Sequence, residues 1–340
     1  MLNKYVRTVA VTVLAVSAVA VANAQSVVKT ITLPNLAEQL AADPILDRIY
    51  VAVPNFGVKP YDYLTVIDGK KDVVIDNLKI PPYAYAIAVD PLTHDVYVGG
   101  TSQDENGIDQ SVVLEYCVWG KRVVKEIHVS STTGDGILGL AVNSFTGDVY
   151  VSNGSDNEID VIGRKSSKVS QRIPLSGEPF GVTVNPFSNV VYAALLDGSV
   201  SVINGKTYAI TTTTIVPPTA PDATVANAGI TVDVVTGNVF ATNALYALSS
   251  SVGVLDHAAT FLTNISVGNT PIGIDVDPIT GLVFVANTQD GTVNVLNSTT
   301  NTVSKTLAVS GLFLTVNPFS EKVYVGADNS SPTVTVISEK

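Results

Sequence analysis

The segment that decides the fold reads TPIGIDVDPITGLVFVANTQDGTVNVLNSTTNTVSKTLAV and covers residues 270–309. It contains four short runs in which apolar residues alternate with small or polar ones, at 273–276, 283–287, 293–297 and 303–309. Such alternation between turn residues is the signature of β-strands. The sequence DPITG at 277–281 predicts a tight turn between the first two runs, because Asp can bond its own backbone two residues on and Pro presets φ. The segment therefore predicts a unit of four antiparallel strands.

This unit recurs seven times along the chain. Relatives of its turn occur at intervals of 40–53 residues and begin at Asp43, Asp90, Asn143, Asn185, Asp233 and Asn317. An aromatic residue follows every turn within the second strand, as Tyr50, Tyr97, Tyr150, Tyr192, Phe240, Phe284 and Tyr324. A self-similar period of this length in strand-forming sequence predicts a propeller or a solenoid.

The ends of the chain decide between these two architectures. The seventh copy lacks its fourth strand, because the chain stops at Lys340. The segment VVKTITL at 27–33 matches the fourth-strand pattern and precedes the first copy. An N-terminal strand that completes the last blade closes a ring and leaves only short edges. We therefore predict an all-β, seven-bladed β-propeller of four-stranded blades, formed as a single domain by residues 25–340.

The amino-acid composition argues against several classes of function. The 340 residues are 46% apolar and 14% charged, with 30 acidic side chains against 19 basic ones. This acidic balance argues against a nucleic-acid backbone as the main partner. The single cysteine, Cys117, excludes an intrachain disulfide and any multi-cysteine metal site.

Residues 1–24 are predicted to be a signal peptide. Lys4 and Arg7 precede an apolar run from Val9 to Val21, and Ala22-Asn23-Ala24 supplies the small residues of a cleavage site. The alternative is a retained N-terminal anchor, although the apolar run is short for a bilayer span. Cleavage leaves 17 basic and 30 acidic side chains, a net charge of −13. We expect an exported protein, periplasmic, secreted or cell-surface associated, with no membrane span after removal of this segment.

The repeats also resemble a known family. The stretches at 270–309 and 139–162, the latter reading GLAVNSFTGDVYVSNGSDNEIDVI, are similar to YVTN-family β-propeller repeats. The resemblance covers essentially all of the chain after residue 24, with degraded copies at AVPN and ATNA. It implies a seven-bladed fold, typically in exported or surface-associated microbial proteins. The motif residues are structural, so the resemblance implies no catalytic site.

The candidate ligand site is the upper rim, formed by the loops that enter each first strand and those between second and third strands. These loops differ most between copies and converge on the axis, where propellers generally bind. Tyr85, Phe180 and Phe313 stand just ahead of the small first-strand residues, with Glu38 equivalent to Tyr85. The predicted set is Glu38, Tyr83, Tyr85, Asp135, Glu178, Phe180, Asn227, Asn269 and Phe313. The competing interpretation is that the aromatic residues fill the axis and the polar groups face water.

Catalytic residues are not predicted. His94 falls in a lower turn, His128 on an outer strand and His257 after a third strand, so none lies on the upper rim. An acid–base mechanism there would need a histidine within hydrogen-bond reach of the substrate. No haem-attachment or nucleotide-binding motif occurs, and no cofactor or metal ligand is assigned.

The predicted function is a non-enzymatic propeller, expected to be monomeric, that binds a small polar ligand, a glycan or a partner protein on its upper rim. The alternative is a lyase or lactonase-like hydrolase assisted by Ca²⁺ or Mg²⁺, since these cations need only oxygen ligands. Asp135, Glu178, Asn227 and Asn269 would supply those oxygens. Whether these side chains converge decides between the two.

Overall fold

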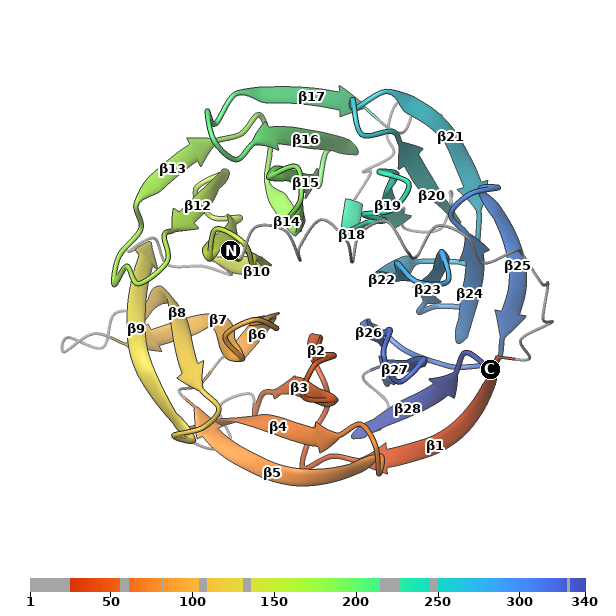
Figure 1. The fold of residues 1–340 in the computed structure, drawn as a ribbon, viewed down its shortest axis with the longest axis horizontal. Helices are drawn as coiled ribbons and strands as arrows, with labels where there is room; N and C mark the ends of the chain where they lie inside the picture. Colours follow the sequence, from red (N-terminus) through yellow and green to blue (C-terminus); the bar gives the residue numbers. More distant parts are fainter. Residues whose placement is uncertain are drawn as a thin grey trace, which may run out of the picture.

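The computed structural model describes residues 25–55, 61–80, 82, 84–103, 109–130, 136–214, 227–244, 250–328 and 331–340. These residues form 28 strands in seven four-stranded antiparallel sheets, arranged as the blades of a ring (Figure 1). The predicted seven-bladed β-propeller is thus confirmed. No described helix is long and apolar enough to cross a bilayer. The predicted signal peptide lies outside the described residues and stays a prediction.

The blades follow the chain in order, each with its first strand innermost. Blade 1 contains β2 (Leu40–Asp43), β3 (Arg48–Val53), β4 (Asp62–Asp68) and β5 (Val73–Ile80). Blade 2 contains β6 (Ala84–Asp90), β7 (Asp95–Gln103), β8 (Asp109–Cys117) and β9 (Arg122–Ser130). Blade 3 contains β10 (Ile137–Asn143), β11 (Asp148–Asn153), β12 (Glu158–Ile162) and β13 (Gln171–Pro174).

The remaining blades repeat this plan. Blade 4 contains β14 (Pro179–Asn185), β15 (Val190–Leu195), β16 (Ser199–Asn204) and β17 (Ile210–Thr214). Blade 5 contains β18 (Asn227–Val232), β19 (Val239–Ala244), β20 (Ser250–Leu255) and β21 (Phe261–Ser266). Blade 6 contains β22 (Pro271–Asp277), β23 (Leu282–Asn287), β24 (Thr292–Asn297) and β25 (Thr302–Leu307). Blade 7 contains β26 (Leu314–Asn317), β27 (Lys322–Gly326), β28 (Thr333–Ser338) and β1 (Ser26–Thr32).

The ring closes as the sequence predicts. β1 is the outermost strand of blade 7 and pairs antiparallel with β28, with Val27 opposite Ile337 and Ile31 opposite Val334. In Figure 1 the red start of the described chain therefore lies beside its blue end. The two ends of the domain hold one sheet together.

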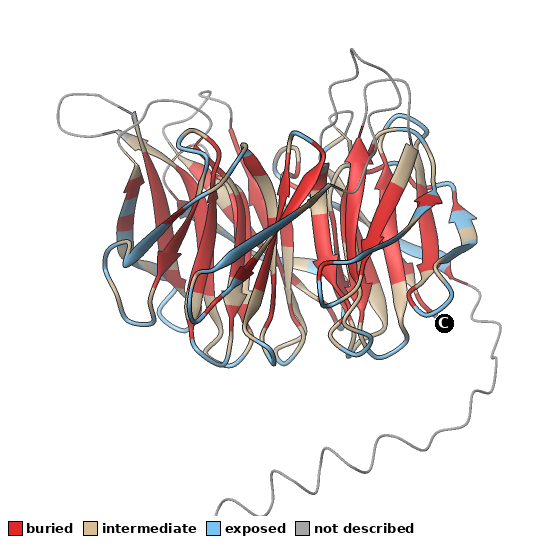
Figure 2. Cartoon of the chain, turned by 90° about the horizontal axis from the view of Figure 1, so that it is seen from above, coloured by how far each residue is buried: buried red, intermediate tan, exposed pale blue. Residues whose placement is uncertain are grey.

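The core lies between the blades. Seven clusters of buried apolar side chains occur, and each draws its residues from two neighbouring blades, including blades 7 and 1. The aromatic residue of every second strand is buried in these clusters, Tyr97 being the most exposed at 8%. Burial on both faces explains why the blades carry few charged residues. The fourth strands are outermost and largely exposed, as in the alternating pattern of β5 (Figure 2).

The turns between first and second strands share one chemistry and form the lower face, at the bottom of Figure 2. The opening Asp or Asn accepts the backbone N–H two residues on, as Asp277 Oδ1 does from Ile279 at 2.7 Å. The fifth turn residue has a positive φ in every copy, from 50° at Asp47 to 79° at Gly237. This conformation is the left-handed one predicted for the Gly position, and here Asp, His, Asn and Glu also adopt it.

Candidate functional site

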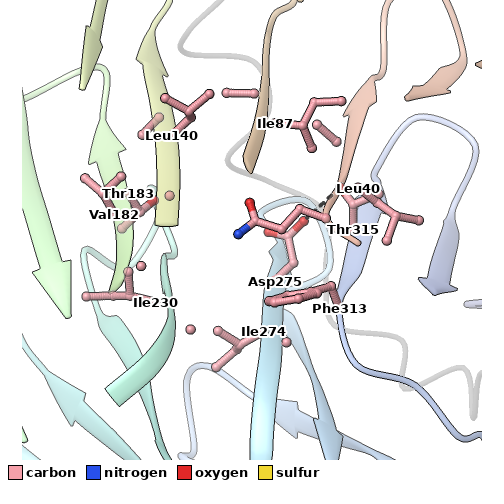
Figure 3. Close-up of a pocket in the computed structure, with 18 of the residues that line it drawn as sticks. Leu40, Ile87, Leu140, Val182, Thr183, Ile230, Ile274, Asp275, Phe313 and Thr315 are labelled. Carbon is pink, nitrogen blue, oxygen red and sulfur yellow. Dashed lines mark hydrogen bonds between the residues drawn. The ribbon is translucent and has the colours of Figure 1, made fainter. Parts of the chain in front are cut away.

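The first strands of all seven blades line a central channel, which contains a cavity of about 390 Å³ (Figure 3). Its walls are strands β2, β6, β10, β14, β18, β22 and β26. Corresponding residues of the seven repeats therefore meet around one axis. The channel is best described as layers, each contributed by one position of the repeat.

One layer is a complete aliphatic ring. Its members pair with the residue that follows the buried aromatic in each second strand, as Leu40 does with Val51 and Ile274 with Val285. The ring consists of Leu40, Ile87, Leu140, Val182, Ile230, Ile274 and Leu314, all 5–8% exposed. This layer makes the middle of the channel apolar on every side.

The next layer down is polar on one side only. The position opposite the buried aromatic is alanine in blades 1, 2 and 3, namely Ala41, Ala88 and Ala141. In blades 4 to 7 the same position is occupied by Thr183, Thr231, Asp275 and Thr315. These four polar positions form an arc around the ring, of which Thr183, Asp275 and Thr315 line the cavity together with the three alanines.

Asp275 is the centre of this arc. Its Oδ1 accepts the N–H of Val276 at 2.8 Å and the Thr231 hydroxyl at 3.4 Å. Its Oδ2 accepts the N–H of Val316 at 2.9 Å and the Thr315 hydroxyl at 3.3 Å. One half-buried carboxyl group thus ties β18, β22 and β26 together, and Figure 3 shows it facing into the cavity.

Asp275 is the one ionisable side chain among the described residues that line the cavity. Burial raises the pKa of its carboxyl to about 6, although the four hydrogen bonds favour the charged form and act in the opposite direction. Desolvation disfavours a carboxylate because water no longer solvates the charge. A carboxyl group that titrates near pH 6 in an apolar channel is suited to pair with a cationic group.

Phe313 and Gln39 lie one position above the aliphatic ring. The equivalent position is glycine in blades 3 to 6, where a Cβ at Gly139, Gly181 or Gly273 would stand 2.6–2.7 Å from a carbonyl oxygen of the next blade. Those blades therefore pack backbone against backbone. Blade 7 has a phenylalanine there, and Figure 3 shows its ring in the cavity beside Asp275. Gln39 Nε2 donates to the Leu138 carbonyl oxygen at 2.8 Å, which links blade 1 to blade 3.

Two of the predicted rim residues line the cavity, Phe180 and Phe313. These two residues do not occupy equivalent positions in their blades, however. The pairing of first with second strands makes Leu314 equivalent to Val182. Phe313 is therefore equivalent to Gly181, the residue that follows Phe180.

Four other predicted residues are described and lie outside the lining of the cavity. Glu38 is half-buried, and this burial raises the pKa of its carboxyl. Tyr85 is half-buried at the start of β6. Glu178 is exposed, with its side chain over Gly154. Asn269 is exposed, and its side-chain amide donates to Asp290 Oδ1 at 2.9 Å while its carbonyl accepts from Ser250 at 2.8 Å.

The oxygen ligands considered for a cation are not brought together where they are described. Glu178 precedes the first strand of blade 4 and Asn269 that of blade 6, with blade 5 between them. Tyr83 and Asp135 lie outside the described residues, as does the Asn227 side chain. In the described parts of the chain, no three His, Cys, Asp or Glu side chains are grouped so as to hold a metal ion.

The histidines lie where the sequence predicts. His94 is in the lower turn of blade 2, with Nδ1 2.7 Å from Asp43 Oδ2 of blade 1. His128 is within β9, and His257 follows β20. None of the three lines the central cavity as the described residues define it.

Asp275, Gln39 and the threonines of the arc line or adjoin the cavity but were not predicted as site residues from the sequence. A signal was present, because the first-strand sequences GVTV, GITV, GIDV and FLTV carry Thr or Asp at the aligned position where YAIAV and LGLAV carry their second-to-last residue, Ala. No protein-family model matches the chain, and a search of the curated proteins finds no match. The resemblance to YVTN-family repeats therefore rests on the repeat sequence itself.

Proposed function

We propose that this protein is an exported, non-enzymatic β-propeller of the YVTN type that binds a small ligand in its central channel. The observation that carries the proposal is Asp275, whose carboxyl group is the one ionisable group among the described residues that line the cavity. The predicted signal peptide supports export, and the repeat wording supports the family. The ligand class that fits this channel is a small organic cation with an apolar body.

Each part of such a ligand has a matching layer. An ammonium group would pair with the Asp275 carboxylate, and a charge-assisted hydrogen bond of this kind is about twice as strong as a neutral one. The Phe313 ring lies in the cavity beside Asp275, so it would contact the same cation. The apolar body would contact the aliphatic ring, and a cavity of about 390 Å³ has the size of small-molecule sites.

The channel lining fits a cationic ligand better than the glycan predicted from the sequence. A glycan needs several convergent polar side chains, and of the predicted rim residues that the structure describes only Phe180 and Phe313 line the cavity. A cationic ligand needs one carboxylate, which the channel has.

A matched pair of probes tests the charge requirement. Benzylamine, cationic at neutral pH, is expected to bind the chain at least about tenfold more tightly than neutral benzyl alcohol, because only the amine forms the ion pair. Asp275→Asn should abolish that difference, and Phe313→Ala should weaken both probes. Isothermal titration calorimetry gives the affinities, and thermal unfolding shows whether each variant is folded. Equal affinities of the wild-type chain for the two probes would contradict the proposal.

The pH dependence provides a second measurement on the unmodified chain. The pKa of Asp275 is about 6, so the carboxylate fraction rises as the pH increases through this value. Benzylamine stays protonated over the same range. We therefore expect its affinity to be several-fold higher one unit above about pH 6 than one unit below it. An unchanged affinity across this range would show that Asp275 does not carry the binding.

A further inference from the structure

The lower face carries an exposed apolar ring. The third residue of each turn between first and second strands is large and apolar in all seven blades, and these side chains are 52–73% exposed. Four members are aliphatic, namely Ile45, Leu92, Val235 and Ile279. Three are aromatic, namely Phe145, Phe187 and Phe319. We call these seven residues the lower ring.

The fold does not need apolar side chains at these positions. In each turn the opening Asp or Asn satisfies the backbone N–H of the ring residue, as Asp43 Oδ1 does for Ile45 at 3.1 Å and Asn185 Oδ1 for Phe187 at 3.0 Å. The ring side chain itself points to solvent. A polar residue would serve the turn equally well, so the repeated apolar choice calls for another explanation.

The lower ring is set apart from the rest of the described surface. Of the large apolar side chains that are more than 50% exposed, all belong to this ring except Trp119, at 67%, in the turn between β8 and β9 on the same face. Trp119 lies edge-on to His94, with ring centroids 5.8 Å apart. Phe145 and Phe187 of neighbouring blades touch, with ring centroids 5.3 Å apart. Exposed apolar groups that gather on one face mark an interaction surface.

Basic residues surround this ring on one side. They lie in the turns between third and fourth strands of blades 1 to 4 or, for Arg122, at the first residue of β9, all on the same face. The exposed residues Lys70, Lys71, Arg122, Lys165, Lys168 and Lys206 form no ion pair with any described residue.

Acidic side chains share this face: some pair with lysines, and others stay charged while they accept backbone N–H groups. Asp72 pairs with Lys322 at 2.8 Å and Glu321 with Lys340 at 2.6 Å. Asp68 accepts the N–H of Lys71 at 2.9 Å, and Asp256 accepts those of Ala258 and Thr260. Acidic residues of the upper loops, by contrast, include Glu178, Asp197, Asp290 and Asp328. Among the described residues, basic side chains without an ion-pair partner therefore gather beside the lower ring on blades 1 to 4, on a face that also carries acidic side chains.

We propose that the lower face docks on an anionic lipid surface. Seven apolar side chains spaced around a ring can enter one broad interface together, whereas a single peptide would reach only a few of them. Phe and Trp side chains suit the boundary between headgroups and acyl chains. Unpaired Lys and Arg beside them are attracted to anionic headgroups. This docking would direct the upper mouth of the channel away from the bilayer.

Binding of the lower face to lipid can be followed by the intrinsic fluorescence of the chain. Trp119 is the single tryptophan and lies on the proposed docking face. We expect its fluorescence emission to shift to shorter wavelength when the chain from Gln25 is mixed with phosphatidylglycerol vesicles. Phosphatidylcholine vesicles should give a much smaller shift, and added salt should reverse the effect. An unchanged emission with phosphatidylglycerol would overturn the proposal.

Two matched triple variants separate the lower ring from general surface hydrophobicity. The ring variant combines Ile45→Ser, Leu92→Ser and Val235→Ser. The control combines Ile75→Ser, Leu262→Ser and Val303→Ser, which remove the same residue types from exposed positions of β5, β21 and β25. In vesicle sedimentation we expect the ring variant to bind phosphatidylglycerol about tenfold more weakly and the control to bind normally. Equal losses in both would contradict a specific docking face.

A second copy of the chain is the other partner that could cover the lower ring, and sedimentation velocity distinguishes it from a lipid surface. Sedimentation velocity without lipid is expected to show the same monomeric species for the wild-type chain and the ring variant. A wild-type dimer that the ring variant converts to monomer, without vesicle binding by either, would assign the lower ring to a second copy and overturn the proposal. Thermal unfolding of both variants confirms that any loss of binding reflects the surface and not misfolding.

Discussion

A chain that begins at Pro34 is expected to unfold with about 3–6 kcal/mol less free energy than the chain from Gln25. The deletion removes β1, and with it the buried side chains of Ile31 and Leu33, both 5% exposed. Full burial of each is worth about 1.5–3 kcal/mol. The loss also leaves β28 as an open edge strand in blade 7.

Urea denaturation followed by circular dichroism measures this effect, and a peptide of residues 25–33 provides the rescue. The peptide should restore the stability of the shortened chain, because β1 contributes mainly through pairing with β28 and through these two side chains. The control is Val27→Ser with Val28→Ser in the full chain, since both residues are 50% exposed. Equal stability of the shortened and full chains would show that closure by β1 is dispensable.

Replacing Glu339 with glutamine is expected to stabilise the protein by roughly 4 kcal/mol at and above about pH 8. Glu339 follows β28 and is 1% exposed. Burial, and then the neighbouring carboxyl of Asp277, raise the pKa of Glu339 to about 8. Its Oε1 and Asp277 Oδ2 are buried without other partners among the described residues, so a proton on Glu339 can bridge them. Glutamine keeps a donor there and carries no charge.

The sign of the pH dependence follows from the direction of this shift. The unfolded chain releases the Glu339 proton near pH 4.5, whereas the folded chain holds it up to about pH 8. Between these values the folded state binds more protons, so the unfolding free energy of the wild-type chain should fall as the pH rises. Glu339→Gln should flatten this slope in urea titrations at several pH values. Glu321→Gln, at the more exposed ion pair with Lys340, serves as the control and should leave the slope in place.

The fold was predictable because every copy of the repeat contains the same four strands and the same turn. The missing fourth strand of the last copy and the extra strand at 27–33 were visible without coordinates, and β1 pairs with β28 as they require. The positive φ of the fifth turn residue likewise follows from Asp, Asn or Gly in five of the lower turns, whereas His94 and Glu321 adopt it in the other two. Local chemistry repeated seven times is strong evidence for a closed ring.

The channel was less predictable because it depends on comparisons across the ring. Asp275 looks like an ordinary strand residue in GIDV, and three of its four hydrogen bonds come from residues about 40 positions away on two other blades. The side chain of Asn269 looked available for a ligand, yet Asp290 and Ser250 occupy its polar atoms. Partners of this kind are set by the loops of neighbouring blades, which the repeat pattern does not describe.

The pairing of β1 with β28 also has a consequence for the order of folding. Val27 and Ile337 are separated by almost the whole domain, so their contact is among the most non-local in the chain, and such contacts form slowly. During synthesis β1 is made first and has no partner until the last blade exists. β1 exposes little buried apolar surface while it is unpaired, because only Ile31 of its seven residues is buried in the folded protein. The other residues include Lys29, Thr30 and Thr32. The strand that stays unpaired longest during synthesis is thus one whose side chains are mostly compatible with solvent.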